Sequence, residues 1–342
     1  MKDKSITIGF CDFWPDFDPF NNFFVEILSK KFNVTVNNED PDFLFCSLLG
    51  DKSFNFSCTK IVFIGENITP DFNIFDYALG FDWINFEDRY FRLPLYRLNM
   101  TIDGNKHRDI DFLSGEAASK SGFCNFLYSN NWCSHPIREQ FFNLLSQYKK
   151  VDSGGGVCNN LGYRVSNKHA WQRTYKFSIA FENSLKHGYT TEKLYQALCA
   201  HTVPIYWGNP LVSEEFNSKR FINVHEYATL EDVVDRVREL DNDPQKFLAV
   251  LSEPYFANDP PPIVNEDPAF EKFLVNIIQQ GPEKSKRVTR DGFSRNYYSE
   301  LRAMKKLKTA ARSLIHCKIL TYPRRLLQNL TKLAKTVGMR LK

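Results

Sequence analysis

The sequence predicts an α/β protein with two parallel-sheet domains, and three observations support this fold class. The chain has 342 residues, which is too long for one ordinary hydrophobic core and suggests two domains. Short apolar runs of strand length alternate with segments of helical periodicity, as in βαβ units. A polar, aperiodic stretch at 101–120 separates the first such series from a second one. We therefore expect two α/β domains joined near that stretch.

The first series opens with an apolar run at 5–11 that predicts a short buried strand. Residues 20–31 follow with apolar side chains at helical spacing, which predicts an amphipathic helix. The clearest strand ends at a turn that carries Glu66. The further strands of this series are expected at 32–36, 42–46 and 60–65.

The second series opens with a predicted strand at 122–130 and a helix at 136–148 that carries Pro136 at its first position. The next helix is expected at 190–200, with a threonine near its start. The remaining strands are expected at 176–183 and 202–208, and the remaining helices at 229–241 and 266–279.

The composition excludes several classes of protein. Hydrophobic residues make up 43% of the chain and charged residues 25%, which is typical of globular proteins and not of disordered ones. No window approaches the ~18 consecutive apolar residues of a membrane span, and the first ten residues do not resemble a signal peptide. We therefore expect a cytoplasmic protein. The eight cysteines form no CxxC pair, so we interpret them as buried reduced thiols rather than zinc or redox sites.

The charge is unevenly distributed. Residues 301–342 contain twelve basic and no acidic residues, which leaves 32 basic and 40 acidic residues in the rest of the chain. Between 324 and 340 one helical face is apolar and basic residues lie off it, the pattern of an interfacial helix on an anionic membrane. The alternative is a helix that packs on the protein or on another subunit. Nucleic acid is not an expected partner, since few aromatic residues interrupt the basic stretches. The apolar face carries Leu326, Leu327, Leu330, Leu333 and Val337.

The densest polar signal lies at 181–193, where a predicted strand ends and a helix begins. Ligands of open α/β sheets bind beyond the carboxyl ends of the strands, and a helix N-terminus there suits a phosphate. Lys193 in the first turn opposes the helix dipole, which is understandable if its ammonium group faces an anion. Glu192 beside it can accept hydrogen bonds from sugar hydroxyls. The alternative is an ordinary surface Glu–Lys pair.

Ordered motifs over residues 60–240 resemble the α-1,3-fucosyltransferases, and most closely their bacterial branch. The set as a whole is specific, although no single motif would be. The matching stretches are FIGEN (63–67), FDYALGFD (75–82), DRYFRLPLY (88–96), FLYSNN (126–131), YKKVDSGGGVCNNLG (148–162), AFENS (180–184), GYTTEK (188–193), HTVPIYWG (201–208) and FINVHEY (221–227).

The resemblance implies a GT-B fold, in which two Rossmann-like domains face each other across a cleft. The acceptor-binding domain would span 1–118 and the GDP-fucose-binding domain 119–299, followed by a basic amphipathic helical tail at 300–342. It implies transfer of fucose from GDP-L-fucose, with inversion, to the GlcNAc of a β-galactosyl-N-acetylglucosamine acceptor, as in Lewis x-type glycans. No metal is expected to be required. The tail would place the enzyme at the inner membrane face.

The resemblance also carries residue roles onto this chain. Glu66 matches the base that accepts the acceptor proton, and Glu192 matches a second carboxylate that contacts the donor. Arg138 and Lys193 match the cations that bind the diphosphate. The donor-binding positions are matched by Asn183 and Tyr189. Alternatives remain at this stage: Glu66 as an exposed loop carboxylate, Arg138 as a solvated helix residue, and Tyr189 as part of the core.

Two further features admit alternatives as well. The glycines at 154–156 allow a ligand to approach the backbone closely, or they form a simple turn. His187 is interpreted as a loop residue, because transfer from a phosphate leaving group needs no general acid. The alternative functions are a GT-B transferase for another nucleotide sugar, and a membrane-associated binding protein with an inactive site.

Overall fold

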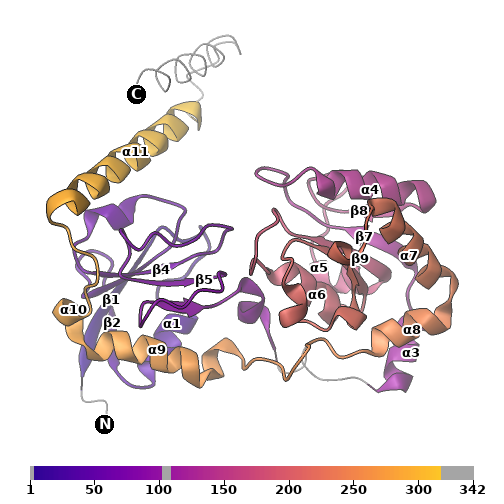
Figure 1. The fold of residues 1–342 in the computed structure, drawn as a ribbon, viewed down its shortest axis with the longest axis horizontal. Coiled ribbons are helices and arrows are strands. Elements are labelled where there is room, and N and C mark those ends of the chain that lie inside the picture. Colours follow the sequence, from indigo (N-terminus) through magenta and orange to yellow (C-terminus); the bar gives the residue numbers. More distant parts are fainter. Residues whose placement is uncertain (1–3, 102–108, 317–342) are drawn as a thin grey trace.

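A computed structural model describes residues 4–101 and 109–316, with side chains described as far as residue 307. It contains two all-parallel sheets, one of six strands and one of five, each covered by helices. The two domains lie side by side along the long axis of the molecule (Figure 1). The predicted α/β fold of two parallel-sheet domains is confirmed.

The first sheet has the strand order β2-β1-β3-β4-β5-β6. Every residue of its central strand β4 is buried, because helices and segments of the returning chain cover both faces. The strands are β1 Ser5–Cys11, β2 Asn33–Val36, β3 Phe43–Cys46, β4 Thr59–Phe63, β5 Tyr77–Gly80 and β6 Tyr90–Arg92. All five neighbouring pairs run parallel.

Helix α1, Phe23–Ser29, packs on one face of this sheet and is shorter than the predicted range of 20–31. Its start is set by Asn22, whose side chain accepts hydrogen bonds from the backbone N–H groups of Phe24 and Val25. Asn22 itself has an extended backbone conformation, so the helix cannot begin earlier.

The second sheet has the order β11-β10-β9-β7-β8. Its strands are β7 Gly122–Phe126, β8 Val151–Ser153, β9 Tyr175–Phe181, β10 Val203–Trp207 and β11 Ile222–Asn223. The helices of this domain are α3 Ile110–Ala118, α4 Ile137–Tyr148, α5 Lys168–Arg173, α6 Glu192–Cys199, α7 Leu230–Asn242 and α8 Pro244–Ser252. The structure also contains short 3-10 helices between these elements: η1 Lys52–Asn55, η2 Leu95–Asn99, η3 Val212–Glu214, η4 Ser218–Arg220, η5 Val224–Glu226 and η6 Val264–Glu266.

The stretch expected to be a polar linker contains helix α3. Asp109 caps it by accepting a hydrogen bond from the N–H group of Phe112, and Leu113 is buried in the core of the second domain. The predicted boundary at residue 118 is therefore too late, because α3 docks on the second domain through Leu113 while Ile110 and Phe112 stay exposed. The second domain includes the chain from residue 109.

The chain then returns to the first domain. Helix α9, Pro268–Gln279, buries Phe270, Leu274 and Ile277 in the same core as β1, β3 and β4. Helices α10, Gly281–Lys284, and α11, Gly292–His316, follow on the same domain (Figure 1). The predicted end of the second domain at residue 299 is therefore wrong, because apolar periodicity shows that a helix has a buried face but not which sheet covers it.

The predicted tail at 300–342 begins inside α11, whose Tyr298 is buried against the first domain. The proposed amphipathic stretch at 324–340 lies outside the described residues. Across residues 4–101 and 109–316, no helix has both the length and the apolar character that crossing a bilayer requires. None of the seven cysteines in these ranges forms a disulfide; Cys46 and Cys124 are buried, whereas Cys133 is exposed.

Candidate active site

The carboxyl ends of the two sheets meet through a loop that follows β9. In this loop, the Ser184 hydroxyl accepts a hydrogen bond from the amide of Asn67, which follows β4. Lys186 forms an ion pair of 2.9 Å with Asp82, which follows β5. The two domains therefore contact each other at the edge where ligands of parallel sheets bind.

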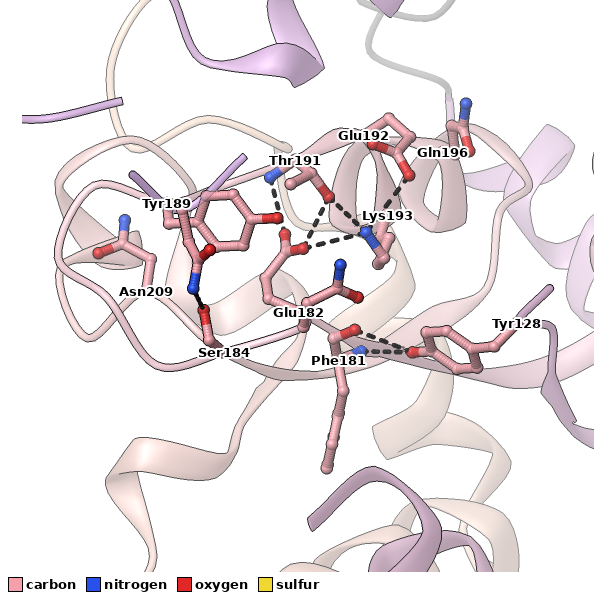
Figure 2. A network of polar contacts seen from close by, with 12 residues as sticks. Tyr128, Phe181, Glu182, Ser184, Tyr189, Thr191, Glu192, Lys193, Gln196 and Asn209 are labelled. Carbon is pink, nitrogen blue, oxygen red and sulfur yellow. Dashed lines mark hydrogen bonds and ion pairs between the residues drawn. The ribbon is translucent and has the colours of Figure 1, made fainter. Parts of the chain in front are cut away.

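The N-terminus of α6 is organised by Glu182, a carboxylate with no exposed surface. It accepts hydrogen bonds of 2.7 Å from both the backbone N–H and the hydroxyl of Thr191, and one of 3.2 Å from the Lys193 ammonium (Figure 2). Burial raises the pKa of Glu182 above its usual range, although Lys193 acts in the opposite direction. Glu182 thus satisfies the helix start and holds Lys193 in place.

Lys193 lies between two carboxylates. Its ammonium is 3.2 Å from Glu182 and 3.4 Å from Glu192, and it donates a 2.8 Å hydrogen bond to the hydroxyl of Thr191. Burial alone would lower the pKa of Lys193, but the two carboxylates raise it, so the group stays cationic. Three oxygen atoms thus fix this ammonium group at the start of α6.

Glu192 is the first residue of α6. Burial by itself would raise the pKa of its carboxyl, but the ammonium groups of Lys193 and Lys168 lower it below its usual range. Lys168 donates a 2.7 Å hydrogen bond to Gln196 one turn further along α6. Glu192 is therefore an anionic hydrogen-bond acceptor in a basic environment.

Arg138 on α4 is buried rather than solvated, with 1% of its surface exposed. Its guanidinium donates hydrogen bonds to the Asn183 side chain at 2.6 Å and to the Phe181 carbonyl at 3.3 Å. Its Cζ atom lies 4.0 Å from the centre of the Tyr128 ring. The Tyr128 hydroxyl forms hydrogen bonds with backbone groups at the end of β9. The buried Nε atom has no hydrogen-bond partner within the described ranges. The guanidinium therefore keeps donor capacity beside Asn183.

Four of the six predicted site residues line one cavity of about 410 Å³ in the second domain. Three residues that were not among the predicted site residues line the same cavity. Arg164 and Lys168 are basic, and Tyr128 provides a ring face. The four predicted residues that meet there are Arg138, Asn183, Glu192 and Lys193.

The glycines at 154–156 line the same cavity, and the structure gives a packing reason for them. A side chain on Gly155 would place its Cβ 2.2 Å from the Tyr128 carbonyl oxygen, and one on Gly156 would lie 2.1 Å from that of Ser129. The run is thus required by the close approach of two loops, and it leaves backbone atoms facing the cavity.

The other two predicted residues meet at the contact between the domains. Glu66 is exposed just after β4, whereas Tyr189 is 1% exposed and packs edge-on against Phe81. The Tyr189 hydroxyl donates to Glu66 Oε2 at 3.4 Å. Tyr189 does not line the 410 Å³ cavity; it reaches the first domain instead. His187 is exposed in the same loop, as expected.

Sequence reasoning missed Glu182 as a functional residue, although it lies inside a quoted motif. The sequence did contain a signal for it, namely a carboxylate directly after a continuous apolar strand. A charge buried at that depth requires ionic or hydrogen-bonding partners. Among the described residues no group of three or more His, Cys, Asp and Glu side chains is placed to hold a metal ion.

Two Rossmann-like domains whose strand ends face each other, with a basic cavity at the strand ends of the second, are the arrangement of the GT-B class of glycosyltransferase folds. The profile described as the alpha-(1,3)-fucosyltransferase FucT N-terminal domain matches residues 8–99, and that of the glycosyltransferase family 10 (fucosyltransferase) C-terminal domain matches 117–252. The chain belongs to glycosyltransferase family 10.

Known relatives agree with this assignment. The chain is 35% identical over 295 residues to the alpha-(1,3)-fucosyltransferase FucT of Helicobacter pylori, covering 74% of this chain and 61% of that protein. It is 36% identical over 122 residues to a 3-galactosyl-N-acetylglucosaminide 4-alpha-L-fucosyltransferase of Bos taurus, covering 35% and 33%. Thus it spans less than two thirds of either relative. A crystal structure of an alpha1,3-fucosyltransferase with GDP-fucose superimposes with a TM-score of 0.66 at 30% identity, covering 84% of this chain and 92% of that one.

Proposed function

We propose that the protein is an inverting α-1,3-fucosyltransferase that uses GDP-L-fucose. One observation carries this proposal. The cavity lined by Arg138 and Lys193 lies in the second domain, and the loop just before Lys193 carries Tyr189, whose hydroxyl donates to the exposed Glu66 of the first domain. The family membership and the similar crystal structure with GDP-fucose support the donor.

In the proposed reaction, the bond between the fucose anomeric carbon and the β-phosphate oxygen of GDP breaks, and its electron pair leaves with the phosphate. Lys193 and Arg138 stabilise the charge that develops on this leaving group. The planar fork of Arg138 suits phosphate oxygens, and Lys193 acts as a point charge at the α6 N-terminus. Because these cations supply positive charge, we propose that the reaction does not depend on a metal ion.

Glu66 is the proposed general base. The acceptor hydroxyl oxygen attacks the anomeric carbon from the face opposite GDP, which inverts the configuration, and its proton passes to the Glu66 carboxylate. The exposure of Glu66 between the domains allows a sugar hydroxyl to reach it. The proposed acceptor hydroxyl is O3 of the GlcNAc in a β-galactosyl-N-acetylglucosamine unit.

The proposed location is the cytoplasmic surface of an anionic membrane. The support is the basic composition of 301–342 and the apolar face expected at 324–340. Sedimentation with vesicles that contain anionic lipid, compared with neutral vesicles, tests it. Binding that is unchanged after removal of 317–342 would contradict the proposed role of this stretch.

The activity is tested by incubating the protein with GDP-L-fucose and N-acetyllactosamine in the presence of EDTA and searching for a fucosylated trisaccharide by mass. A product supports donor, acceptor class and metal independence together, and NMR then assigns the linkage. Thermal unfolding with GDP, UDP and CDP is the parallel test, because a ligand that binds the folded state raises the melting temperature. Stabilisation by UDP or CDP, but not by GDP, would favour the transferase for another nucleotide sugar.

A further inference from the structure

A bidentate ion pair joins the two domains beside the proposed site. Arg92, the last residue of β6, donates to both carboxylate oxygens of Glu215, which follows η3, at 2.7 and 2.9 Å. The side chains are 17% and 6% exposed. The Tyr96 hydroxyl donates a further 2.7 Å hydrogen bond to Glu215. Two parallel hydrogen bonds in a largely buried setting fix the geometry as well as the distance.

This ion pair also forms hydrogen bonds with both chain neighbours of Tyr189. The Arg92 guanidinium donates to the carbonyl of Gly188 at 3.2 Å, and the Thr190 hydroxyl donates to Glu215 at 3.5 Å. The residue before Tyr189 is thus tied to the arginine, and the residue after it to the glutamate.

Within the second domain, Asn209 provides a matching support. Its side-chain oxygen accepts a 2.8 Å hydrogen bond from the Gly188 N–H, and its amide donates to the Thr190 hydroxyl at 3.0 Å. Asn209 has no exposed surface. Figure 2 labels both Asn209, from the loop after β10, and Tyr189, from the loop after β9. One support of the segment 188–190 therefore belongs to its own domain, and the other crosses to the first domain.

The segment approaches the first domain closely at Gly188. Gly188 has a φ of +80°, and a Cβ there would lie 2.2 Å from the Phe81 carbonyl oxygen. Arg92 donates to that same carbonyl at 3.0 Å and lies 3.8 Å over the ring of Trp83. Arg92 is therefore fixed to its own domain by the groups that Gly188 touches.

We propose that Arg92 is a positioning residue for fucosyl transfer, acting through Tyr189 on Glu66. With Glu215 it fixes the segment 188–190 against the first domain, and so keeps the Tyr189 hydroxyl on the Glu66 carboxylate. This inference rests on the proposed function for its catalytic consequence, but the fixing of the segment does not.

The test compares Arg92→Gln, Arg92→Lys and Glu215→Gln in the full chain. Loss of the fork should lower kcat by up to about tenfold in Arg92→Gln, because its effect passes through the Tyr189 hydroxyl, which makes one hydrogen bond to a charged group. The Kd for GDP should stay near that of the wild type. Arg92→Lys keeps the charge but not the bidentate geometry, so it should be intermediate. Hydrogen exchange in peptides covering 184–191 should be faster in Arg92→Gln and Glu215→Gln.

Arg97→Gln is the matched control. Arg97 is also buried and ion-paired, at 2.8 Å to Asp267, but its hydrogen bonds go to Asp267 and the Pro262 carbonyl rather than to Glu215 or the segment 188–190. The Arg97→Gln variant should lose as much thermal stability as Arg92→Gln. Its kcat and its hydrogen exchange at 184–191 should stay at the wild-type values. The proposal is overturned if Arg92→Gln and Arg97→Gln agree in both readouts, or if Arg92→Gln loses GDP binding as much as turnover. If the wild type transfers no fucose, the proposed function fails, and the exchange comparison alone decides whether the segment is fixed by Arg92.

Discussion

The hydroxyl of Tyr189 lies 3.4 Å from the carboxylate of Glu66, so a buried side chain of the second domain touches an exposed carboxylate of the first. Tyr189 is only two residues before Thr191, which precedes α6, donates a hydrogen bond to Glu182 and accepts one from Lys193. The proposed base and the proposed diphosphate site are therefore connected through five consecutive residues, 189–193.

Replacing Glu66 with glutamine should abolish fucosyl transfer and leave GDP binding intact. The variant keeps the shape of the side chain but cannot accept the acceptor proton, and general base catalysis contributes about 10²–10⁴-fold. Product formation by mass spectrometry and calorimetry with GDP measure the two effects. Glu87→Gln is the control, since Glu87 is an exposed glutamate on the next loop. Equal activity of the two variants would contradict the assignment of the base.

Replacing Tyr189 with phenylalanine separates two roles for this residue. If the hydroxyl acts on Glu66, as the geometry indicates, kcat should fall about tenfold, the effect of one hydrogen bond to a charged group. The Kd for GDP should not change, because Tyr189 lies outside the 410 Å³ cavity. A weakened Kd with normal kcat would instead support the donor-binding role implied by the family resemblance.

Replacing Arg138 with lysine should weaken GDP binding by about tenfold or more, because lysine cannot reproduce a bidentate fork. The ammonium should also lose the 2.6 Å contact to Asn183 and the stacking on Tyr128. The measurement is the rise in melting temperature with GDP, which separates lost affinity from lost stability. A normal GDP-induced rise in a destabilised variant would show that Arg138 serves only the fold.

Burial lowers the pKa of His201 to about 4, although Glu116 opposes this shift. The unfolded chain has the usual value of 6.5, so between pH 6.5 and 4 it binds more protons than the folded protein. Stability should therefore fall as the pH is lowered through this window, by on the order of 2–3 kcal/mol from this group alone. The Tyr255 hydroxyl contacts the ring, and the cations of Lys120, Arg173 and Arg220 lower the pKa further.

Denaturant unfolding at several pH values measures this effect in His201→Asn. Asparagine tolerates the left-handed backbone at this position, where φ is +51°. The variant should lose less stability than the wild type on acidification. His187→Asn, at an exposed position, serves as the control and should keep the wild-type slope. Identical slopes in all three proteins would refute the prediction.

Replacing Tyr298 with phenylalanine should destabilise the first domain by about 1–3 kcal/mol, the penalty for an unsatisfied buried group. Its hydroxyl accepts a 2.8 Å hydrogen bond from Lys60, whose pKa is lowered to about 8 by burial and by Arg290. The neighbouring Tyr297→Phe, at a more exposed position, should change stability by less than about 0.5 kcal/mol. Equal effects would show that α11 is not anchored through Tyr298.

Local features were largely predictable from the sequence. The strand expected at 60–65 is β4, and the helix expected at 190–200 begins at Glu192 because Thr191 has an extended conformation before it. Four of the six candidate residues share a cavity because they lie at strand ends and helix starts of one sheet. The family motifs cover the same elements. Their chemical roles remain proposals.

Other features could not be predicted because they depend on contacts between distant segments. The polar stretch at 101–120 contains α3, which docks through Leu113. Helix α9 packs on the first sheet although it follows the second domain in the chain. The buried state of Arg138 depends on Tyr128 and Asn183. In each case the residue pattern shows that a surface is apolar or charged, but not what covers it.

The sequence by itself determined the fold class, the family and the segments that carry the candidate residues. These depend on local periodicity, turn residues and ordered motifs, which are properties of neighbouring positions. Only the tertiary structure decided that Tyr189 contacts Glu66 and that Arg92 pairs with Glu215, because each pair is 123 residues apart in the chain. Such contacts form only when two separately folded sheets meet at their carboxyl ends, and that meeting depends on shape and burial across the whole molecule.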